Sequence, residues 1–383
     1  MGDKRILLLH ISDVSGHRCA SLAIQKALQE IDATVKTKSI NAFNYTNPFL
    51  EKFINWLYMF VIKATPGIWD YLYDNEAVLK KAGKTRLLIH KLNDKKIKKL
   101  FDDFRPDIVV CTQAFPCGMV ADYKRRHNLN IPLIGVLTDY APHSYWLNNL
   151  VDAYIVPAPK IKERFLQRGV SEARLKVLGI PIDSEFGKRG DPQQIRQRLG
   201  LDLKLPAVLI MGGGQGLGPI RQIVQILNKL KTPAQLIVVC GTNKRLYKWL
   251  QKNKTAFNKP LWVRGYMDKI NDLMEISNFI VTKPGGLTST EALTKSLPII
   301  IVNPLPGQES MNTRALLEMK AALKVESFSE LASLAEELLS NSARLTTLRK
   351  NAAAAAIRDS APKAAQLILS MIKKQAQDAI PSL

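Results

Sequence analysis

The chain has 383 residues, of which 46% are apolar and 7% aromatic, a composition typical of a globular α/β protein and not of a disordered or fibrous chain. Its length is sufficient for two domains, each with its own core. The formal net charge of +22 at pH 7 predicts an anionic partner, either nucleic acid or a membrane rich in acidic lipids.

The four cysteines, Cys19, Cys111, Cys117 and Cys240, are widely spaced and form no Cys-x-x-Cys pair. The sequence therefore predicts neither a zinc site nor a disulfide framework, and a reduced, cytosolic setting is expected. The first apolar run, Ile6–His10, is too short for a signal peptide, and no window reaches the roughly 18 apolar residues of a spanning helix.

The first half of the chain alternates strands and helices, beginning with a strand at Ile6–His10 and a helix that starts near His17. This helix shows one apolar face, formed by Ala20, Ala23, Ile24, Ala27, Leu28 and Ile31. Ligands of α/β proteins bind at such strand-to-helix loops, and the positive end of a helix lowers the pKa of an imidazole. The helix end therefore favours the neutral, basic form of His17; the alternative is an ordinary polar residue in the first helical turn.

The stretch from Phe43 to Tyr73 is dense in apolar and aromatic residues, and the stretch from Lys80 to Arg105 carries ten basic residues against three acidic ones. The first stretch is either a buried core helix or an element that enters the lipid interface. The second is either a solvated helix face or a surface for anionic lipids. We predict that the two form a membrane-docking pair.

Further strands are expected at Ile108–Cys111, Leu133–Leu137, Val151–Val156 and Lys176–Leu178, and an interdomain hinge at Gly179–Asp183. Asp139 and His143 follow the second of these strands, at the sheet edge where ligands bind. This pair is therefore a candidate for contact with a ligand. The alternative is that the two residues only brace their loop.

The second half begins with a strand at Ala207–Met211 and the glycine loop Gly212–Gly218, after which Pro219 is suited to open a helix. Glycines allow the backbone N–H groups to approach a diphosphate. A Rossmann dinucleotide site is the alternative, but the next strand, Leu236–Cys240, leads into Gly241–Asn243 without the acidic residue that such a site needs. Further helices are expected at 328–339, 343–357 and 361–375.

The most informative stretch combines a strand at Phe279–Val281, a turn at Pro284–Gly286 and a helix opened by Thr288–Glu291. A buried strand at Ile299–Val302 and a polar loop at Pro306–Glu309 follow. A helix N-terminus at this sheet edge attracts an anion, and the Glu291 carboxylate is suited to accept two hydroxyl protons of a ribose. The alternative is a capping box, in which Glu291 bonds back to the Thr288 N–H.

The segments Thr282–Leu293, Leu297–Ile300 and Pro306–Asn312 resemble the donor-sugar site of the processive diacylglycerol glucosyltransferases of bacteria and the plant-type monogalactosyldiacylglycerol synthases. The transferase that adds N-acetylglucosamine to lipid I in peptidoglycan synthesis is a more distant relative. The resemblance extends from about Ile6 to about Leu317. It implies an α/β fold of the GT-B type, with two Rossmann-like parallel-sheet domains facing a central cleft.

The domains implied by the resemblance are an acceptor- and membrane-facing domain at 1–183, a UDP-sugar-binding domain at 184–360, and a C-terminal helix at 361–383 that crosses back to the first domain. The implied activity is inverting transfer of a hexose, glucose or galactose, from a UDP-sugar to the hydroxyl of diacylglycerol, which makes a membrane glycolipid. No metal and no cofactor beside the donor are expected, and the chain has no Asp-x-Asp motif.

Three alternatives remain open. One is an N-acetylglucosaminyltransferase acting on a lipid-linked peptidoglycan precursor, and another is a nucleotide-sugar epimerase. The third, a nucleic-acid-binding protein, would explain the charge, but no recognised nucleic-acid motif is present. We therefore expect UDP-sugar, diacylglycerol and an anionic membrane surface as partners, no nucleic acid, and a peripheral location on the cytoplasmic face of the cell membrane.

The resemblance also implies roles for individual residues, with His17 as the general base, Asp139 as its possible assistant, and Gly16, His143 and Trp146 on the acceptor side. In the family the loop before the histidine is rich in glycine, whereas here only Gly16 remains. The implied donor-binding set comprises Gly212, Gly213, Gly214, Gly216, Thr242, Asn243, Gly265, Tyr266, Met267, Lys283, Gly285, Gly286, Leu287, Thr288, Glu291, Gly307, Gln308, Glu309 and Asn312.

Within this set, the loop Gly265–Met267 is expected beside uracil and Glu291 on the ribose. The turns Gly212–Gly218 and Gly285–Thr288 are expected on the diphosphate. Gln308 and Glu309 are expected on the hexose hydroxyls.

Overall fold

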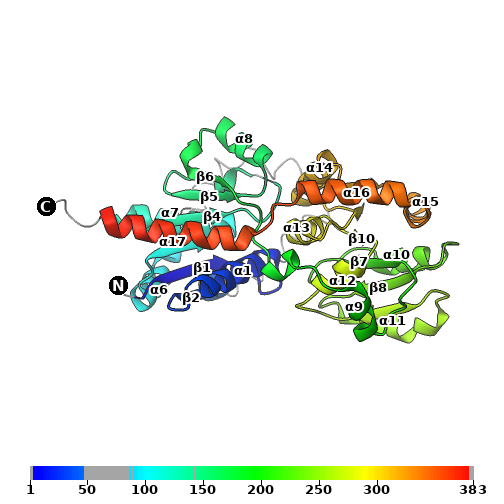
Figure 1. The fold of residues 1–383 in the computed structure, drawn as a ribbon. Helices are drawn as coiled ribbons and strands as arrows, with labels where there is room; N and C mark the ends of the chain where they lie inside the picture. The colour runs from blue at the N-terminus through cyan, green and yellow to red at the C-terminus, as the bar shows by residue number, and fades with distance from the viewer. Residues whose placement is uncertain (1–2, 47–86, 88–89, 142, 379–383) are drawn as a thin grey trace. The chain divides into compact units, whose positions relative to one another are not determined.

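The computed structural model of the protein describes residues 3–46, 87, 90–141 and 143–378, and the chain divides into two compact units (Figure 1). The first unit ends at Ser184 and takes in the chain again from Asp359, together with Pro306–Gln308. The second unit contains Glu185–Leu305 and Glu309–Arg358.

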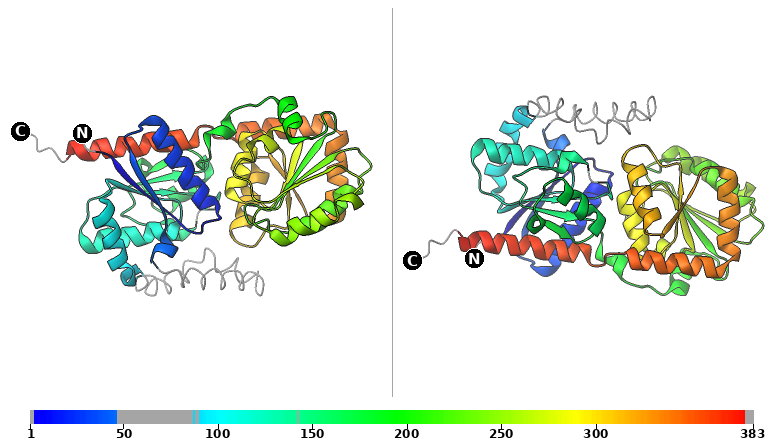
Figure 2. Two further views of the ribbon diagram at one scale, coloured as in Figure 1. Left: turned by 90° about the horizontal axis from the view of Figure 1, so that it is seen from below. Right: turned by 90° about the horizontal axis from the view of Figure 1, so that it is seen from above.

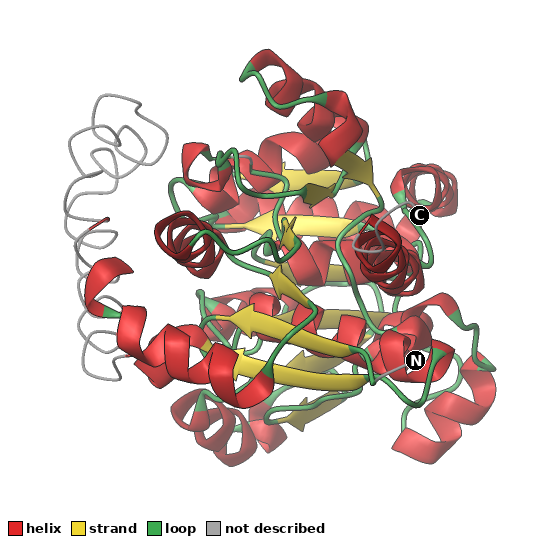
Figure 3. Ribbon diagram, turned by 90° about the vertical axis from the view of Figure 1, so that its left-hand side faces the viewer, coloured by secondary structure: helices red, strands yellow, loops and turns green. Residues whose placement is uncertain are grey.

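The first unit is built on a parallel sheet of six strands in the order β2-β1-β3-β4-β5-β6. Its strands are β1 (Arg5–His10), β2 (Lys36–Asn41), β3 (Ile108–Cys111), β4 (Leu133–Val136), β5 (Ala153–Val156) and β6 (Leu175–Val177). Every residue of β3, β4 and β5 is buried. Near-continuous apolar strands of this kind require helices on both faces of the sheet, and Figure 3 shows the strands covered by helices.

The helices of this unit are α1 (Gly16–Ile31), α2 (Ala42–Thr46), α6 (Asp94–Phe104), α7 (Ala114–His127), α8 (Pro159–Gln167) and α17 (Ser360–Asp378). The C-terminal helix α17 packs against α1, and alanines of both helices share one core cluster with the strands (Figure 2). The predicted apolar face of α1 is buried except at Ile31. This residue is the last of the helix and is 45% exposed.

The second unit repeats the architecture with six parallel strands in the order β12-β11-β10-β7-β8-β9. Its strands are β7 (Ala207–Met211), β8 (Gln235–Val239), β9 (Leu261–Arg264), β10 (Phe279–Thr282), β11 (Ile299–Val302) and β12 (Ala322–Val325). Its helices are α9 (Pro192–Leu199), α10 (Ile220–Asn228), α11 (Lys244–Lys252), α12 (Asn271–Ile276), α13 (Gly286–Thr294), α14 (Gln308–Glu318), α15 (Phe328–Ser340) and α16 (Ser342–Ala355). The right-hand view of Figure 2 shows this sheet enclosed by helices.

Three details differ from the sequence predictions. Strands β2 and β12 were not predicted, because both lie at sheet edges and lack a continuous apolar run. Helix α13 begins at Gly286, not at Thr288. Gln308 and Glu309, which were expected in a loop, form the first turn of α14.

The predicted membrane-docking pair lies largely outside the described residues. Of its aromatic part, Phe43 is buried in α2 and stacks on Phe115 with ring centroids 4.5 Å apart. Of its basic part, α6 buries Ile97 and Leu100 and exposes its lysines. No helix among the described residues combines the length and apolar character that crossing a bilayer requires.

A buried ion pair connects helices α12 and α13 to the start of the second unit. The Nζ atom of Lys295, whose side chain is 1% exposed, lies 2.7 Å from the Glu275 carboxylate and 2.5 Å from the Lys188 carbonyl oxygen. Arg189 approaches the other Glu275 oxygen at 3.2 Å. Such a pair is costly to break, because either partner alone leaves an unpaired charge in the core.

We predict that Glu275→Gln lowers the free energy of unfolding by about 3 to 5 kcal/mol, because it leaves the Lys295 ammonium buried without its counter-charge. Urea unfolding of the full chain measures the change. As the matched control, the double variant Glu275→Leu with Lys295→Met removes both charges and is expected to recover most of the loss. A single variant as stable as the native chain would contradict the prediction.

Candidate functional site

Each sheet has one point where its strand order reverses, and ligands of open α/β sheets bind at the carboxyl edge beside such a point. In the first unit the reversal lies between β1 and β3. In the second unit it lies between β7 and β10. The loops that follow β1, β7 and β10, or the helices that these loops open, hold His17, Gly212–Gly218, Lys283 and Glu291.

His17 is the second residue of α1 and is placed by the loop that follows β1. Ser15 caps the helix, since its Oγ accepts a hydrogen bond from the Arg18 N–H at 3.3 Å and donates to the Ile11 carbonyl oxygen at 2.8 Å. Ser12 has a φ of +57°, a backbone conformation that favours glycine. The loop therefore makes its turn without the glycines that the family uses.

The imidazole of His17 is held by the loop that follows β3. Its Nδ1 lies 3.0 Å from the Thr112 carbonyl oxygen and 2.6 Å from the Thr138 hydroxyl. A carbonyl oxygen only accepts hydrogen bonds, so we assign the proton to Nδ1, and the Thr138 hydroxyl then accepts from the same N–H. The other ring nitrogen, Nε2, is then the unprotonated one that can accept a proton.

Burial lowers the pKa of His17 from 6.5 to about 4, the Thr112 carbonyl partly offsets this effect, and nearby His10 lowers the pKa further. His10 itself is buried at the end of β1, and burial lowers its pKa too. The imidazole of His17 is thus neutral at physiological pH, as a base must be.

The structure shows a partner of His17 that the sequence analysis missed, Thr112. The signal was a polar residue directly after the fully apolar strand Ile108–Cys111, but nothing in the sequence links Thr112 to His17, 95 residues earlier. Thr138, which directly follows the predicted strand Leu133–Leu137, was likewise assigned no role from the sequence. Asp139, its neighbour, remains a predicted helper of His17.

The other residues predicted on the acceptor side are Gly16, which precedes His17 in the chain, and His143 and Trp146, which follow β4 of the same sheet. Gly16 is the first residue of α1. His143 immediately precedes the short 3-10 helix Ser144–Trp146, and its ring centroid is 6.2 Å from that of Trp146. Trp146 is 5% exposed, and its ring lies over Gly135 of β4, where an added Cβ would approach it to 3.3 Å.

In the second unit, the loops after β7 and β8 interlock through backbone contacts that only glycine allows. A Cβ on Gly216 would lie 1.9 Å from the Cys240 carbonyl oxygen, and one on Gly241 would lie 2.3 Å from the Gly214 carbonyl oxygen. Both glycines also have positive φ values, +61° and +56°. The Thr242 N–H donates to the Gly214 carbonyl oxygen at 2.9 Å.

The side-chain amide of Asn243 links the glycine loop to the start of helix α11. Its Nδ2 donates to the Gly216 carbonyl oxygen at 3.1 Å, and its Oδ1 accepts from the Leu246 N–H at 3.0 Å, which caps α11. The loop after β9, which contains Gly265 and Met267, adjoins Gly241, and Tyr266 is 44% exposed there.

Lys283 follows β10 and joins the glycine loop to helix α14. Its Cε would lie 3.5 Å from a Cβ on Gly213, and its Nζ is 2.5 Å from the Glu309 carboxylate. The other Glu309 oxygen accepts from the Leu305 N–H at 2.9 Å. Asn312, fully buried, donates to the Pro284 carbonyl oxygen at 3.0 Å.

Helix α13 carries the predicted anion and ribose groups. Gly285 is its N-cap residue and provides no side-chain cap, so the N–H groups of Gly286, Leu287 and Thr288 open the helix. Because Thr288 is the third helical residue, it is not at the N-cap position, and the capping-box alternative is wrong. Glu291 is 9% exposed, nearly two turns into the helix.

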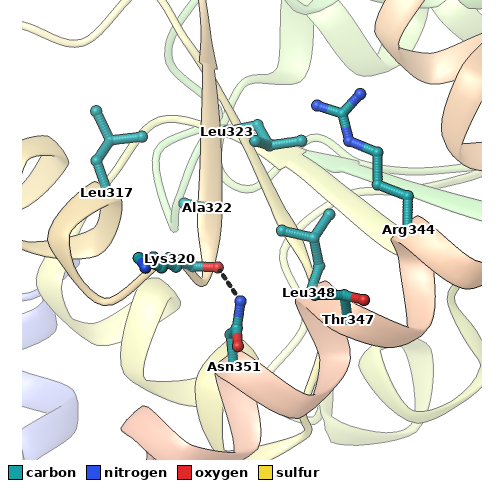
Figure 4. A pocket seen from close by; sticks show the side chains of 8 residues that line it. All are labelled: Leu317, Lys320, Ala322, Leu323, Arg344, Thr347, Leu348 and Asn351. Atoms are coloured by element: carbon teal, nitrogen blue, oxygen red, sulfur yellow. Dashed lines mark hydrogen bonds between the residues drawn. The ribbon is translucent and has the colours of Figure 1, made fainter.

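The open pocket of about 430 Å³ shown in Figure 4 is a different place in the second unit. It is lined by residues of α14, β12 and α16, including Leu317 and Leu348, and Asn351 donates to the Lys320 carbonyl oxygen at 2.9 Å across it. Lys320 and Ala322 stand at the start of β12, so this pocket lies at the amino edge of the sheet, away from the glycine loops.

In the described part of the chain, no group of three or more His, Cys, Asp or Glu side chains is arranged to hold a metal ion.

Comparisons with known proteins agree with this geometry. Residues 17–182 match the family model described as monogalactosyldiacylglycerol (MGDG) synthase, and residues 207–368 match the glycosyltransferase family 28 C-terminal domain. The chain is 30% identical over 351 residues to the processive diacylglycerol beta-glucosyltransferase of Bacillus subtilis, which covers 91% of this chain and 90% of that protein.

Two solved structures show the fold. MurG of Acinetobacter baumannii has a TM-score of 0.61 at 16% identity and covers 96% of this chain and 100% of its own. A putative UDP-N-acetylglucosamine 2-epimerase from Listeria monocytogenes has a TM-score of 0.63 at 16% identity and covers 100% and 99%. The predicted GT-B fold class is confirmed, and transferases and epimerases share this fold.

The His17 imidazole is expected to make folding depend on pH. Its pKa is about 4 in the folded chain and near 6.5 when unfolded, so between these values the unfolded state binds more protons. Stability therefore falls as the pH falls through this window, by on the order of 3 kcal/mol from His17.

His17→Asn keeps a donor for the Thr112 carbonyl oxygen but does not titrate. We expect this variant to lose a large part of the pH dependence in urea unfolding between about pH 7 and about pH 4. A slope equal to that of the native chain would show that the histidine is not held neutral by the fold.

Proposed function

The chain belongs to the glycosyltransferase family of the processive diacylglycerol beta-glucosyltransferases and monogalactosyldiacylglycerol synthases, and we propose that it transfers a hexose from a UDP-sugar to the hydroxyl of diacylglycerol. The product is a membrane glycolipid. The name of the Bacillus subtilis relative favours glucose, and that of the matching family model favours galactose.

The observation that carries the proposal is the orientation of His17. Its Nδ1–H is committed to the Thr112 carbonyl oxygen, so Nε2 is the atom that can take a proton from an acceptor hydroxyl. In the transfer, the acceptor oxygen forms a bond to the anomeric carbon while the bond from that carbon to UDP breaks. The hydroxyl proton passes to Nε2, and UDP leaves with the electron pair, so the anomeric centre is inverted.

The loops of the second unit support a sugar nucleotide as the donor. The N–H groups at the start of α13, together with the turn Gly212–Gly218, suit a diphosphate, because backbone dipoles there oppose its negative charge. Glu291 is assigned to the ribose hydroxyls and the loop at Gly265 to uracil. Glu309 and Gln308, in the first turn of α14, are assigned to the hexose.

We also assign the protein to the cytoplasmic face of a membrane, as a peripheral enzyme, because its acceptor is a lipid. The lysines on the exposed face of α6 support this assignment, since each cation near an anionic leaflet contributes about 1 kcal/mol. Lys98 is also paired with Asp102 at 2.6 Å, an exposed contact that contributes little to stability.

Incubation with radiolabelled UDP-glucose and UDP-galactose, each with diacylglycerol in anionic liposomes, tests the function. We expect label in glycosyl-diacylglycerol. Label confined to a lipid-linked muropeptide acceptor, with UDP-N-acetylglucosamine as donor, would replace the proposal by a peptidoglycan-type transferase. Conversion of the nucleotide sugar without any acceptor would replace it by an epimerase.

We predict that His17→Ala lowers kcat by about 10²- to 10⁴-fold, the usual contribution of a general base. Binding of UDP, measured by calorimetry, is expected to stay within about threefold of the native value, because the substituted residue lies outside the donor loops. Turnover near that of the native enzyme would remove His17 from the mechanism.

We predict that Glu291→Gln raises the KM for the UDP-sugar by more than about tenfold, because a neutral amide accepts the ribose hydroxyls less strongly than a carboxylate. The unfolding free energy should change by less than about 1 kcal/mol, since the Glu291 side chain does not cap the N-terminus of the helix. An unchanged donor KM in steady-state kinetics would refute the ribose assignment.

A further inference from the structure

A second stretch rich in lysine and arginine lies in the second unit. Between Asp202 and Asp268 the sequence contains eleven lysine or arginine residues and no aspartate or glutamate. These eleven charges equal half of the formal net charge of +22. The stretch folds into β7, α10, β8, α11, the 3-10 helix Lys254–Ala256 and β9.

Helix α11 carries four of these eleven charges. It buries Leu246 and Leu250 and exposes Lys244, Lys248 and Lys252, with Arg245 exposed beside them. Within the described residues, none of these four cations forms an ion pair. The main neighbours of α11 are α10, β9 and the 3-10 helix, which all belong to the carboxylate-free stretch and so supply no counter-charge.

The stability of the fold does not explain this arrangement. Lys244 and Arg245 stand in the first turn of α11, directly after the N-cap Asn243, and the first turn has no acidic residue. Cations at the positive end of a helix are unfavourable, whereas aspartate or glutamate would stabilise it. Charges kept at a cost to folding point to a function outside the fold.

We propose that the exposed face of α11 is a docking surface for the headgroups of an anionic bilayer. The proposal rests on the function above only in expecting the enzyme to work at a membrane. Lysines, which supply three of the four cations, act as point charges that suit headgroups without fixed geometry. The surface is separate from the basic stretch Lys80–Arg105 of the first unit.

A nucleic acid is the less favoured occupant, because sequence-independent binding of single strands uses aromatic rings on which bases stack. Both aromatic side chains of α11, Tyr247 and Trp249, pack against the core of the second unit, and the Arg221 guanidinium lies 5.0 Å from the centroid of Trp249. The helix offers cations without an open stacking ring.

The position of α11 would bring a bound membrane surface close to the donor loops. The helix starts at the carboxyl edge of β8, immediately after Gly241–Asn243, whose backbone interlocks with the glycine loop. Headgroups bound at Lys244 and Lys248 would therefore lie beside the edge of the second unit that is assigned to the donor.

The test compares two triple variants with the same change in charge. Lys244→Gln/Lys248→Gln/Lys252→Gln removes the α11 face, and Lys204→Gln/Lys350→Gln/Lys373→Gln removes three exposed lysines from other elements. Binding is measured by sedimentation with phosphatidylcholine vesicles, with and without about one third phosphatidylglycerol, in the absence of substrate. A single-stranded oligonucleotide is tested in parallel.

We expect the α11 variant to bind anionic vesicles at least tenfold more weakly than the native chain, since each lysine contributes about fivefold. The control variant should lose less than about threefold, and added salt should weaken binding of the native chain. Equal losses in the two variants would overturn the proposal, as would an α11 variant that binds vesicles like the native chain. A loss confined to the oligonucleotide would assign the surface to nucleic acid instead.

Lys244→Glu separates docking from folding. We expect it to leave the Tm unchanged or raise it, because it places an acid in the first helical turn, while it weakens vesicle binding. A lowered Tm would show that the cation serves the fold. Sugar transfer to detergent-dispersed diacylglycerol is measured separately. A protein that binds vesicles through α11 but transfers no sugar would refute the proposed function and leave the docking surface in place.

Discussion

The hydrogen bond from His17 Nδ1 to the Thr112 carbonyl oxygen is the contact on which the account of this protein depends. It exists because β1 and β3 are neighbours in the sheet although about 100 residues separate them in the chain. The loops that leave these strands meet at the carboxyl edge, where the strand order reverses. One bond to a backbone oxygen thus fixes which ring nitrogen is free for chemistry.

In the second unit, the predicted donor loops lie at the corresponding point of its own sheet, where the strand order reverses. Its loops after β7 and β8 approach each other so closely that Gly216 and Gly241 cannot carry a side chain, and what they present to a ligand is backbone. Lys283 adds a cation that Glu309 holds at 2.5 Å. A neutral imidazole in one unit and N–H groups with a helix N-terminus in the other are the groups on which the proposed transfer from a sugar diphosphate rests.

Much of the fold followed from local sequence. Continuous apolar runs such as Ile108–Cys111 and Ile299–Val302 predicted buried parallel strands, and the structure confirms both. The edge strands β2 and β12 were missed because an edge strand is only partly covered and does not need such a run. Helix α13 starts two residues before the predicted position because Gly285, and not a side-chain oxygen, occupies its N-cap.

The site was harder to predict than the fold. The resemblance singled out His17, but its tautomer depends on the carbonyl group of Thr112, which has no sequence signature of its own. The competing capping-box interpretation of Glu291 was favoured by the Thr288–Glu291 pattern alone, and the observed start of the helix excludes it. Charge counting also drew attention to Lys80–Arg105, whereas the cations of α11 stand out only once their neighbours in space are known to lack carboxylates.

The protonation of the His17 ring is the most direct test of the central claim. Long-range proton–nitrogen correlation spectra of the ¹⁵N-histidine-labelled protein, with His17→Asn for assignment, distinguish the two tautomers and follow their titration. The account predicts a neutral ring with its proton on Nδ1 that becomes charged only near pH 4. A ring protonated on Nε2, or one that titrates near 6.5, would contradict it.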